Sequence, residues 1–350
     1  MDSKNKTEIQ QLIIEAAPYL EKKKLYVVCN TKSHEFKYEN FNTFDVRTEY
    51  LSDYEFEQVD SMLNKCIPVE RYFFDENDFI SFICNNLVDV KNIIVYNSAQ
   101  SGTGVGRKSL IPAFCSFKGI TVTGSNSYSA SLCRHKYHVI KILESHGVRV
   151  PKTYLYDKGW IFDKPQLGNI YILKPIYESS SIGIDTNSVV CFDKTTIKLI
   201  DEKQKEMRQP IIVQQFINGY EAETPCIVSK NHRLVLNPVG ITLDLSNKLM
   251  GNNILDYQKV YFDEYKFFNM KDTMVDISKI MSVAEFVITI LGLSGLCRVD
   301  FRIDELGNCY VTDVSTNPHF VYHSSVSYAF EQLSFPPETI MKAILSAALI

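Results

Sequence analysis

Short apolar runs alternate with helical patterns over the first 125 residues of the chain. The runs at 24–29, 92–96 and 119–124 have the length and the β-branched content of buried strands. Apolar residues recur at helical spacing over 6–21 and 109–118. Strands that alternate with helices in this way predict a parallel sheet covered by helices.

A longer helix is predicted over 130–147. Its apolar residues recur at helical spacing at Leu132, Val139, Ile140 and Leu143, and Gly147 supplies a helix stop. This pattern places Lys136 one turn into the helix.

The pattern changes to strands and turns from residue 170. The runs at 170–176, 210–217 and 233–245 predict an antiparallel sheet region. A helix is predicted near 275–292. It is followed by two strands, GLCRVDFRID and NCYVTDVS, which a turn at 304–308 joins.

Composition narrows the class of protein. The chain has 350 residues, of which 45% are apolar and 22% charged, and its net charge is −4. These values are typical of a soluble protein with more than one compact domain, and they argue against a general nucleic-acid binder. The polar N-terminus and the lack of an apolar run of about 20 residues predict a cytoplasmic protein without a membrane segment.

The nine cysteines form no C-x-x-C pair. Their places in apolar runs, as at Cys84 and Cys226, predict buried thiols in a reducing compartment and no structural zinc site.

A glycine-rich loop, NSAQSGTGVGRKSL, follows the apolar run at 92–96. Its glycines, at Gly102, Gly104 and Gly106, match neither G-x-G-x-x-G nor the P-loop pattern. The simplest interpretation is a turn that needs positive φ.

Five segments carry residues suited to phosphate and metal chemistry. The first two hold Lys136 and, at the end of a predicted strand, Lys174, which precedes a serine-rich turn closed by Gly183. Lysine side chains bind phosphate as point charges, and serine hydroxyls and backbone N–H groups donate to its oxygens. Each segment judged alone is more typical of an ordinary solvated helix or turn.

The other three segments carry carboxylates. The third presents Glu221 and Glu223 after a strand. In the fourth, Arg298 and Asp300 share one face of a strand, and in the fifth Asp313, Ser315 and Asn317 do the same. Two carboxylates on adjacent strands can hold one or two hard cations, although such a pair can also be a solvated surface.

Taken together and in this order, the segments resemble the D-alanine–D-alanine ligase branch of the ATP-grasp superfamily. The resemblance covers residues 92 to 330 and rests on TGSNSYSASLCRHK at 123–136, ILKPIYESSSIG at 172–183, and RVDF with DVSTNP. It implies a three-domain α/β (α+β) ATP-grasp fold. The expected parts are an N-terminal parallel α/β domain at 1–123 and two ATP-clamping domains at 124–212 and 213–350.

The resemblance implies an ATP site. Lys136 and Lys174 would bind phosphates under a closing loop that contains Glu178, Ser179, Ser180 and Ser181. The adenine would lie against Gln214, Gln215 and Ile217, and Glu221 would hold the ribose. Lys259, one place early relative to a family lysine, is a further expected ATP ligand.

The resemblance also implies a metal site and catalytic residues. Asp300 and Asp313, with Ser315 or Asn317, would bind two Mg²⁺ ions, for which Mn²⁺ is an alternative. Arg298 and Ser180 would stabilise the charge that develops as an acyl phosphate forms and an amine attacks it.

Departures from the family pattern concern the substrates. His319 replaces a glycine and adds a proton donor beside the chemistry, while His323 and Ser324 retain a pair that binds the carboxylate of the attacking amino acid. The family's early E-x-x-V-S segment, whose Glu binds the first D-alanine, has no counterpart in residues 25–50. Arg107 and Lys108 replace the family's Glu-Asp, so we expect one of them to contact an anionic group of the donor.

These observations predict an ATP-dependent carboxylate–amine ligase that joins an amino acid to a small acid other than D-alanine, in specialised metabolism. The alternatives are a D-alanine–D-alanine or D-alanine–D-X ligase, a kinase that stops at phosphoryl transfer, and an inactive nucleotide-binding partner protein. The expected partners are small-molecule acids and amino acids, without nucleic acid or membrane, and a homodimer is left open.

Overall fold

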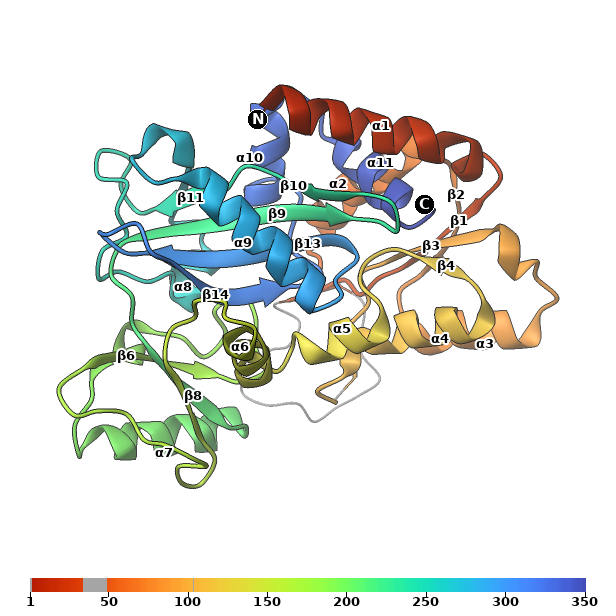
Figure 1. The fold of residues 1–350 in the computed structure, drawn as a ribbon. Helices are drawn as coiled ribbons and strands as arrows, with labels where there is room; N and C mark the ends of the chain where they lie inside the picture. Colours follow the sequence, from red (N-terminus) through yellow and green to blue (C-terminus); the bar gives the residue numbers. More distant parts are fainter. Residues whose placement is uncertain (1, 34–48, 103) are drawn as a thin grey trace.

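Three β-sheets with helices on their faces organise the chain (Figure 1). The structure is a computed structural model that describes residues 2–33, 49–102 and 104–350. The three sheets follow one another along the sequence, and this α/β architecture agrees with the predicted class.

The first sheet is parallel. Its strands lie in the order β2 (Val69–Phe73), β1 (Lys24–Val28), β3 (Ile93–Asn97) and β4 (Thr121–Val122). The helices of this region are α1 (Asp2–Leu20), α2 (Asp53–Cys66), α3 (Glu76–Asn85) and α4 (Leu110–Lys118), with the 3₁₀ turns η2 (Val90–Asn92) and η3 (Arg107–Ser109). The predicted parallel layer is therefore confirmed. Strand β2 escapes the apolar pattern because it is an edge strand with two exposed charged residues.

The single helix predicted over 130–147 is wrong. The structure has two helices, α5 (Ser127–Leu132) and α6 (Lys136–Ser145). The side chain of His135 caps α6 by accepting from the N–H of His138, and the N–H of Lys136 donates to Ile176 at 3.1 Å. Lys136 is consequently the first residue of α6, with its backbone N–H bound to the segment after β6, and does not lie one turn inside a helix.

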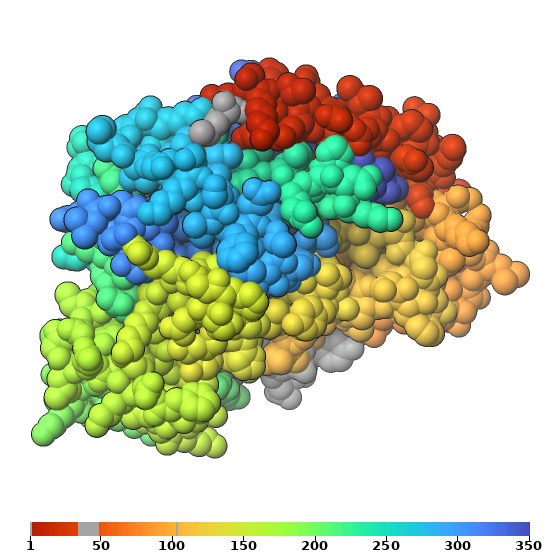
Figure 2. Space-filling view, in the orientation of Figure 1, coloured from red at the N-terminus to blue at the C-terminus, as the bar shows by residue number. Residues whose placement is uncertain are grey.

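The second sheet is antiparallel and also has four strands. Its strands lie in the order β5 (Thr153–Tyr156), β8 (Ile211–Gln215), β6 (Ile170–Pro175) and β7 (Val189–Cys191), the last preceded by η4 (Thr186–Ser188). Helix α7 (Thr196–Met207) packs on it through the buried Ile200, which shares a core with Leu173 and Val213. The residues of this sheet form the yellow-green lobe at the lower left of Figure 2.

The third sheet contains the longest strands. Its strands lie in the order β12 (Lys266–Asn269), β11 (Val239–Thr242), β9 (Tyr220–Val228), β13 (Gly295–Ile303) and β14 (Cys309–Ser315), and β10 (Arg233–Val235) pairs with β9. The remaining helices are α8 (Tyr257–Tyr261), η5 (Met270–Asp272), α9 (Ile277–Ile290), α10 (Ser325–Gln332) and α11 (Glu338–Ala347). The antiparallel prediction is confirmed, but its strands divide between two sheets, β6 and β8 in one and β10 and β11 in the other.

The two ends of the described chain share one core. Ile9 and Leu12 of α1 belong to the same buried cluster as Ile344 of α11, and both helices lie at the same edge of the molecule (Figure 1). The domain boundaries at 123 and 212 stay predictions. Strand β8 runs across the second of them.

All nine cysteines are free thiols. Cys226 is buried as predicted, whereas the prediction for Cys84 is wrong because α3 leaves this side chain exposed. No helix among the described residues is long and apolar enough to cross a membrane.

Candidate active site

A cavity of about 730 Å³ lies where the three sheets meet. Its lining includes Tyr96 from the first sheet, Lys174 from the second and Asp313 from the third. Every residue that the sequence predicts for the site lines this cavity, with the exceptions of Arg107 and Lys259.

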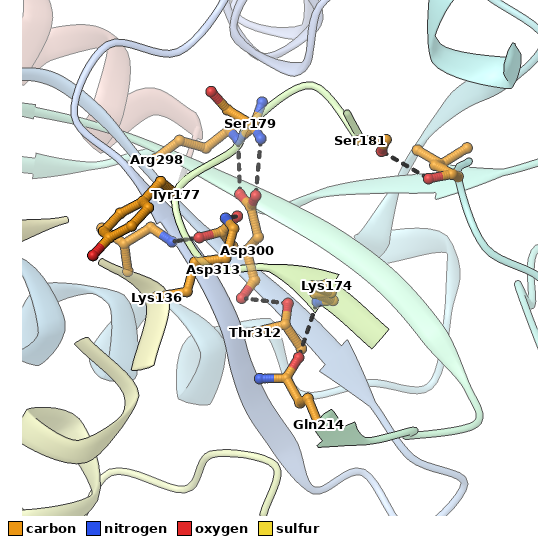
Figure 3. Close-up of polar contacts among 12 residues, drawn as sticks. Lys136, Lys174, Tyr177, Ser179, Ser181, Gln214, Arg298, Asp300, Thr312 and Asp313 are labelled. Atoms are coloured by element: carbon orange, nitrogen blue, oxygen red, sulfur yellow. Dashed lines mark hydrogen bonds and ion pairs between the residues drawn. The ribbon is translucent and has the colours of Figure 1, made fainter. Parts of the chain in front are cut away.

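Two carboxylates face each other across β13 and β14 in this cavity. Asp300 and Asp313 are directly paired in the strand register, next to a bulge between Asp300 and Phe301. Arg298 donates to both oxygens of Asp300, from Nε at 2.7 Å and from Nη2 at 2.8 Å. Lys136 pairs with Asp313 (Figure 3). Each carboxylate thus has a cationic partner from the predicted site.

The surroundings of the two carboxylates differ. Burial raises the pKa of Asp300, and the charge of Arg298 opposes that rise. Burial also acts to raise the pKa of Asp313, but Lys136 outweighs it and holds the pKa of this carboxyl below its usual value.

These carboxylates suit magnesium bound together with a nucleotide. The described residues contain no group of three or more His, Cys, Asp or Glu side chains that could hold a metal. Mg²⁺ is commonly bound by one or two protein carboxylates together with phosphate oxygens, so two carboxylates beside two lysines fit it. Ser315 and Asn317 line the cavity next to Asp313, and both remain predicted ligands.

Lys174 is the second cation of the phosphate region. Its Nζ donates to Oε1 of Gln214 at 2.9 Å (Figure 3). The side-chain amide of Gln214 donates to Thr153 at 3.3 Å. Burial lowers the pKa of Lys174 to about 8. Gln214 therefore already uses the oxygen that the sequence assigns to the adenine amino group.

The serine-rich loop that follows β6 is fixed at three points. Glu178 accepts from Gln209 at 2.7 Å, the N–H of Ser179 donates to Glu49 at 3.2 Å, and the hydroxyl of Ser181 donates to the carbonyl of Leu255 at 2.8 Å. Ser180 and Ser181 both adopt positive φ. The loop is thereby held over the cavity by the N-terminal region on one side and by the 250–268 region on the other.

Glu49 lines the cavity and is not predicted from the sequence. Its carboxylate lies 2.8 Å from Arg107, 3.3 Å from Lys108 and 3.6 Å from Arg134, and it also accepts from the hydroxyl of Ser179. Its side chain is only 2% exposed. Burial alone would raise the pKa of Glu49, but the three cations outweigh it and hold the pKa well below its usual range.

This cluster changes the interpretation of the glycine-rich loop. Gly102 has the positive φ that was predicted, whereas Gly106 has φ −92° and Thr103 lies outside the described residues. Arg107 points its guanidinium at Glu49, and Lys108 reaches the cavity beside Ser179 at 3.5 Å. Contact of either residue with a donor substrate stays a prediction. The sequence has no E-x-x-V-S segment in residues 25–50, and 34–48 of this range lie outside the described residues.

Two further residues join the site from β9 and β13. Glu223 lies 2.9 Å from Nη2 of Arg298, and Arg302 lies 2.8 Å from Glu221. Burial raises the pKa of Glu223 to about 7. The period of two along RVDFR placed Arg302 on the face of Arg298 and Asp300 and could have identified it.

The substrate residues lie at the end of β14 and the start of α10. His319 is 3.6 Å from Glu55, and burial lowers its pKa. His323 has positive φ and packs its ring against Tyr265 at 4.7 Å. Ser324 caps α10 by accepting from the N–H of Ser327 at 3.0 Å, so its hydroxyl also has a structural partner.

Lys259 lies outside the cavity lining. It is in α8, and its ammonium pairs with Asp256, the residue that caps this helix. Its role as an ATP ligand stays a prediction.

Comparison with known proteins identifies relatives of this chain. Residues 163–346 match the family model described as D-ala D-ala ligase C-terminus. The D-alanine--D-alanine ligase of Saccharophagus degradans is 25% identical over 256 residues, which are 72% of this chain and 76% of that protein.

Solved structures share the fold. The D-alanine--D-alanine ligase of Bacillus anthracis complexed with ATP superposes with a TM-score of 0.66 at 15% identity, over 93% of this chain and 97% of that chain. The VanG D-Ala:D-Ser ligase of Enterococcus faecalis gives 0.65 at 16% identity, over 93% and 99%. The family model covers more than half of the sequence. The chain therefore belongs to the D-alanine–D-alanine ligase family and is an ATP-grasp ligase, the class of enzyme that forms carbon–nitrogen bonds.

Proposed function

We propose that the chain is an ATP-dependent ligase that joins D-alanine to a second D-amino acid or related acceptor, a D-alanine–D-X ligase. The observation that carries this proposal is the convergence of three cations and two carboxylates under one serine-rich loop. The relatives named D-alanine--D-alanine ligase and the neighbour named D-Ala:D-Ser ligase support D-alanine as the donor. These relatives do not support the prediction from the sequence that the donor is an acid other than D-alanine.

Different residues of the cavity would bind phosphate, hold the cation and stabilise the developing charge. A carboxylate is a poor electrophile, and ATP with Mg²⁺ supplies the phosphoryl group that activates it. Lys136 and Lys174 bind phosphate oxygens, and Asp300 and Asp313 hold the cation. Arg298 balances the negative charge that builds up where the amine attacks.

The serine-rich loop excludes water from this chemistry. An activated carboxyl hydrolyses readily, so a ligase needs a closed cavity while the amine approaches. The contacts of Ser179 with Glu49 and of Ser181 with Leu255 hold the loop closed from both sides. The start of α10, with Ser324, receives the carboxylate of the acceptor.

The test is a substrate panel with product analysis. ADP release is measured with D-alanine alone, with D-alanine plus D-serine, D-lactate or other amines, and with other small acids in place of D-alanine. An Asp300→Asn variant serves as the inactive control. Mass spectrometry should find an amide or ester of D-alanine together with ADP and phosphate.

Other products select the other candidates. Turnover only with an acid other than D-alanine would restore the specialised-metabolism prediction. A stable phosphorylated product would identify a kinase, and nucleotide binding without turnover on any acid would identify an inactive partner protein.

A further inference from the structure

Arg298 has two anionic partners in the cavity. It donates to both oxygens of Asp300, at 2.7 and 2.8 Å, and its Nη2 lies 2.9 Å from Oε1 of Glu223. The side chains of Arg298, Asp300 and Glu223 are 20%, 17% and 14% exposed, so water screens these contacts weakly.

The first of these partners has a second task. If Asp300 holds a cation, as the proposed function requires, the cation competes with Arg298 for the charge of the same carboxylate. A bidentate arginine–carboxylate pair is the strongest of the common ion pairs, and its guanidinium has a fixed fork geometry. An arginine with Asp300 as its only anion would therefore oppose binding of the cation.

The second partner removes this conflict. Glu223 is opposite Asp300 in the register of β9 and β13, so its carboxylate reaches the same guanidinium from the neighbouring strand. It lines the cavity and has no part in the roles assigned above. We propose that Glu223 is a positioning residue that retains Arg298 at the reacting carboxyl when Asp300 turns to the cation. The proposal rests on the proposed function.

A second pair on the same two strands has a different arrangement. Arg302 lies 2.8 Å from Glu221 and also donates to the carbonyl of Asn253 at 2.8 Å. It also donates to the carbonyl of Gly251 at 3.3 Å, so its contacts besides Glu221 are neutral carbonyls and not a carboxylate that is expected to bind metal. Of these two arginines, Arg298 alone is shared between a second carboxylate, Glu223, and the expected metal ligand Asp300.

The experiment is a Mn²⁺ titration followed by electron paramagnetic resonance, with a saturating ATP analogue that cannot be hydrolysed. Wild type is compared with Glu223→Gln, Glu223→Asp, Arg298→Met and the double variant Glu223→Gln/Arg298→Met. Glu338→Gln, which removes the carboxylate of a Glu–Lys pair outside the cavity, is the control. Thermal unfolding of each variant monitors its folding.

We expect Glu223→Gln to raise the dissociation constant of Mn²⁺ about tenfold, a coupling typical of residues in one charged network. Glu223→Asp should recover most of the affinity. In the Arg298→Met background the Gln substitution should change the constant less than about twofold, because the competing guanidinium is gone.

Three results would overturn the inference. An unchanged constant in Glu223→Gln would show that Arg298 does not compete for Asp300. An equal loss in the Arg298→Met background would show that Glu223 acts on the cation without Arg298. In both of these results wild type still binds Mn²⁺, so only the role of Glu223 fails. If wild type binds no Mn²⁺ with the analogue, the proposed function fails together with the role of Glu223.

Discussion

The two ends of the cavity balance their charges in opposite ways. At the phosphate end, Lys136 pairs with Asp313, and Arg298 pairs with Asp300 and Glu223. Lys174 is the third cation there, so the cations equal these carboxylates in number. At the N-terminal end, Glu49 is the single carboxylate within 4 Å of three cations among the described residues. The paired charges of the phosphate end suit a metal ion that binds together with a nucleotide. The Glu49 cluster is instead a fixed set of contacts that holds the serine-rich loop.

The serine-rich loop joins the two ends. Ser179 donates to Glu49, and its Oγ lies 3.5 Å from Nζ of Lys108. Lys174, which belongs to the phosphate end, lies in β6 just before the loop in the sequence. Damage to the phosphate end should therefore abolish chemistry in a folded protein, and damage to the Glu49 cluster should lower stability and loosen the loop.

The largest effect is expected at the phosphate end. Asp313→Ala removes a proposed metal ligand and leaves Lys136 without its carboxylate, so kcat should fall by about a thousandfold or more. ADP release measures this loss, and circular dichroism should find the fold intact. Asp272→Ala, at a surface carboxylate that is 60% exposed, is the matched control. Full activity in Asp313→Ala would refute the metal assignment.

The next effect concerns the Glu49 cluster. Glu49→Gln leaves Arg107, Lys108 and Arg134 buried close together without their carboxylate, and breaking such a cluster costs about 3 kcal/mol. Urea denaturation should record this loss in the free energy of unfolding. Glu285→Gln, at an exposed position of α9, should lose almost nothing.

A milder variant separates the loop from the cluster. Ser179→Ala removes the hydroxyl that donates to Glu49 but retains all four charges. It should cost about 1.5 kcal/mol, the lower end of what one hydrogen bond to a charged group contributes. Equal losses in Ser179→Ala and Glu49→Gln would contradict the view that the charges form the cluster.

A pH dependence follows from Lys174. Burial lowers its pKa to about 8, and only its protonated form attracts phosphate. The kcat/KM for ATP should therefore fall as pH rises through about 8, by about tenfold for each further pH unit. In Lys174→Arg the guanidinium stays protonated over this pH range, so the fall in kcat/KM above pH 8 should disappear. The value of kcat/KM at lower pH should be smaller than in wild type. A wild-type profile that stays flat to pH 10 would exclude Lys174 as the titrating group.

The smallest effect is expected at Lys259. Its ammonium pairs with Asp256 outside the cavity, so Lys259→Ala should change the KM for ATP less than about threefold, since a partly exposed pair contributes about 0.5 kcal/mol. A tenfold increase in KM would instead support the ATP contact predicted from the sequence and would require the Lys259 side chain to leave Asp256 and turn toward the cavity.

The sequence was most informative where chemistry follows strand periodicity. Arg298 and Asp300 alternate with apolar residues along β13, so the period of two alone places them on one face of the strand. Asp313 follows Thr312, at a register shift that breaks the alternation along β14, so the period of two is a weaker guide there. It was less informative about Lys136, because the break between α5 and α6 depends on the cap at His135 and on the contact with Ile176, which is distant in sequence.

Glu49 could not be found in this way. It follows a polar stretch without apolar periodicity, and Arg107, its nearest cationic partner, is 58 residues further along the chain. The prediction of a substrate contact for Arg107 came from its charge and from the place that the resemblance to the family gives it. A charge in a sequence does not reveal whether the fold already supplies its partner.

Isotope transfer tests directly whether the enzyme activates a carboxylate by phosphoryl transfer. The enzyme is incubated with ATP, an acceptor amine and D-alanine whose carboxylate carries ¹⁸O, and the released phosphate is analysed by mass spectrometry. If the D-alanine carboxyl is phosphorylated and the amine then displaces phosphate, each phosphate should contain one ¹⁸O atom. Phosphate released without ¹⁸O would mean that water attacked ATP, and it would contradict the account.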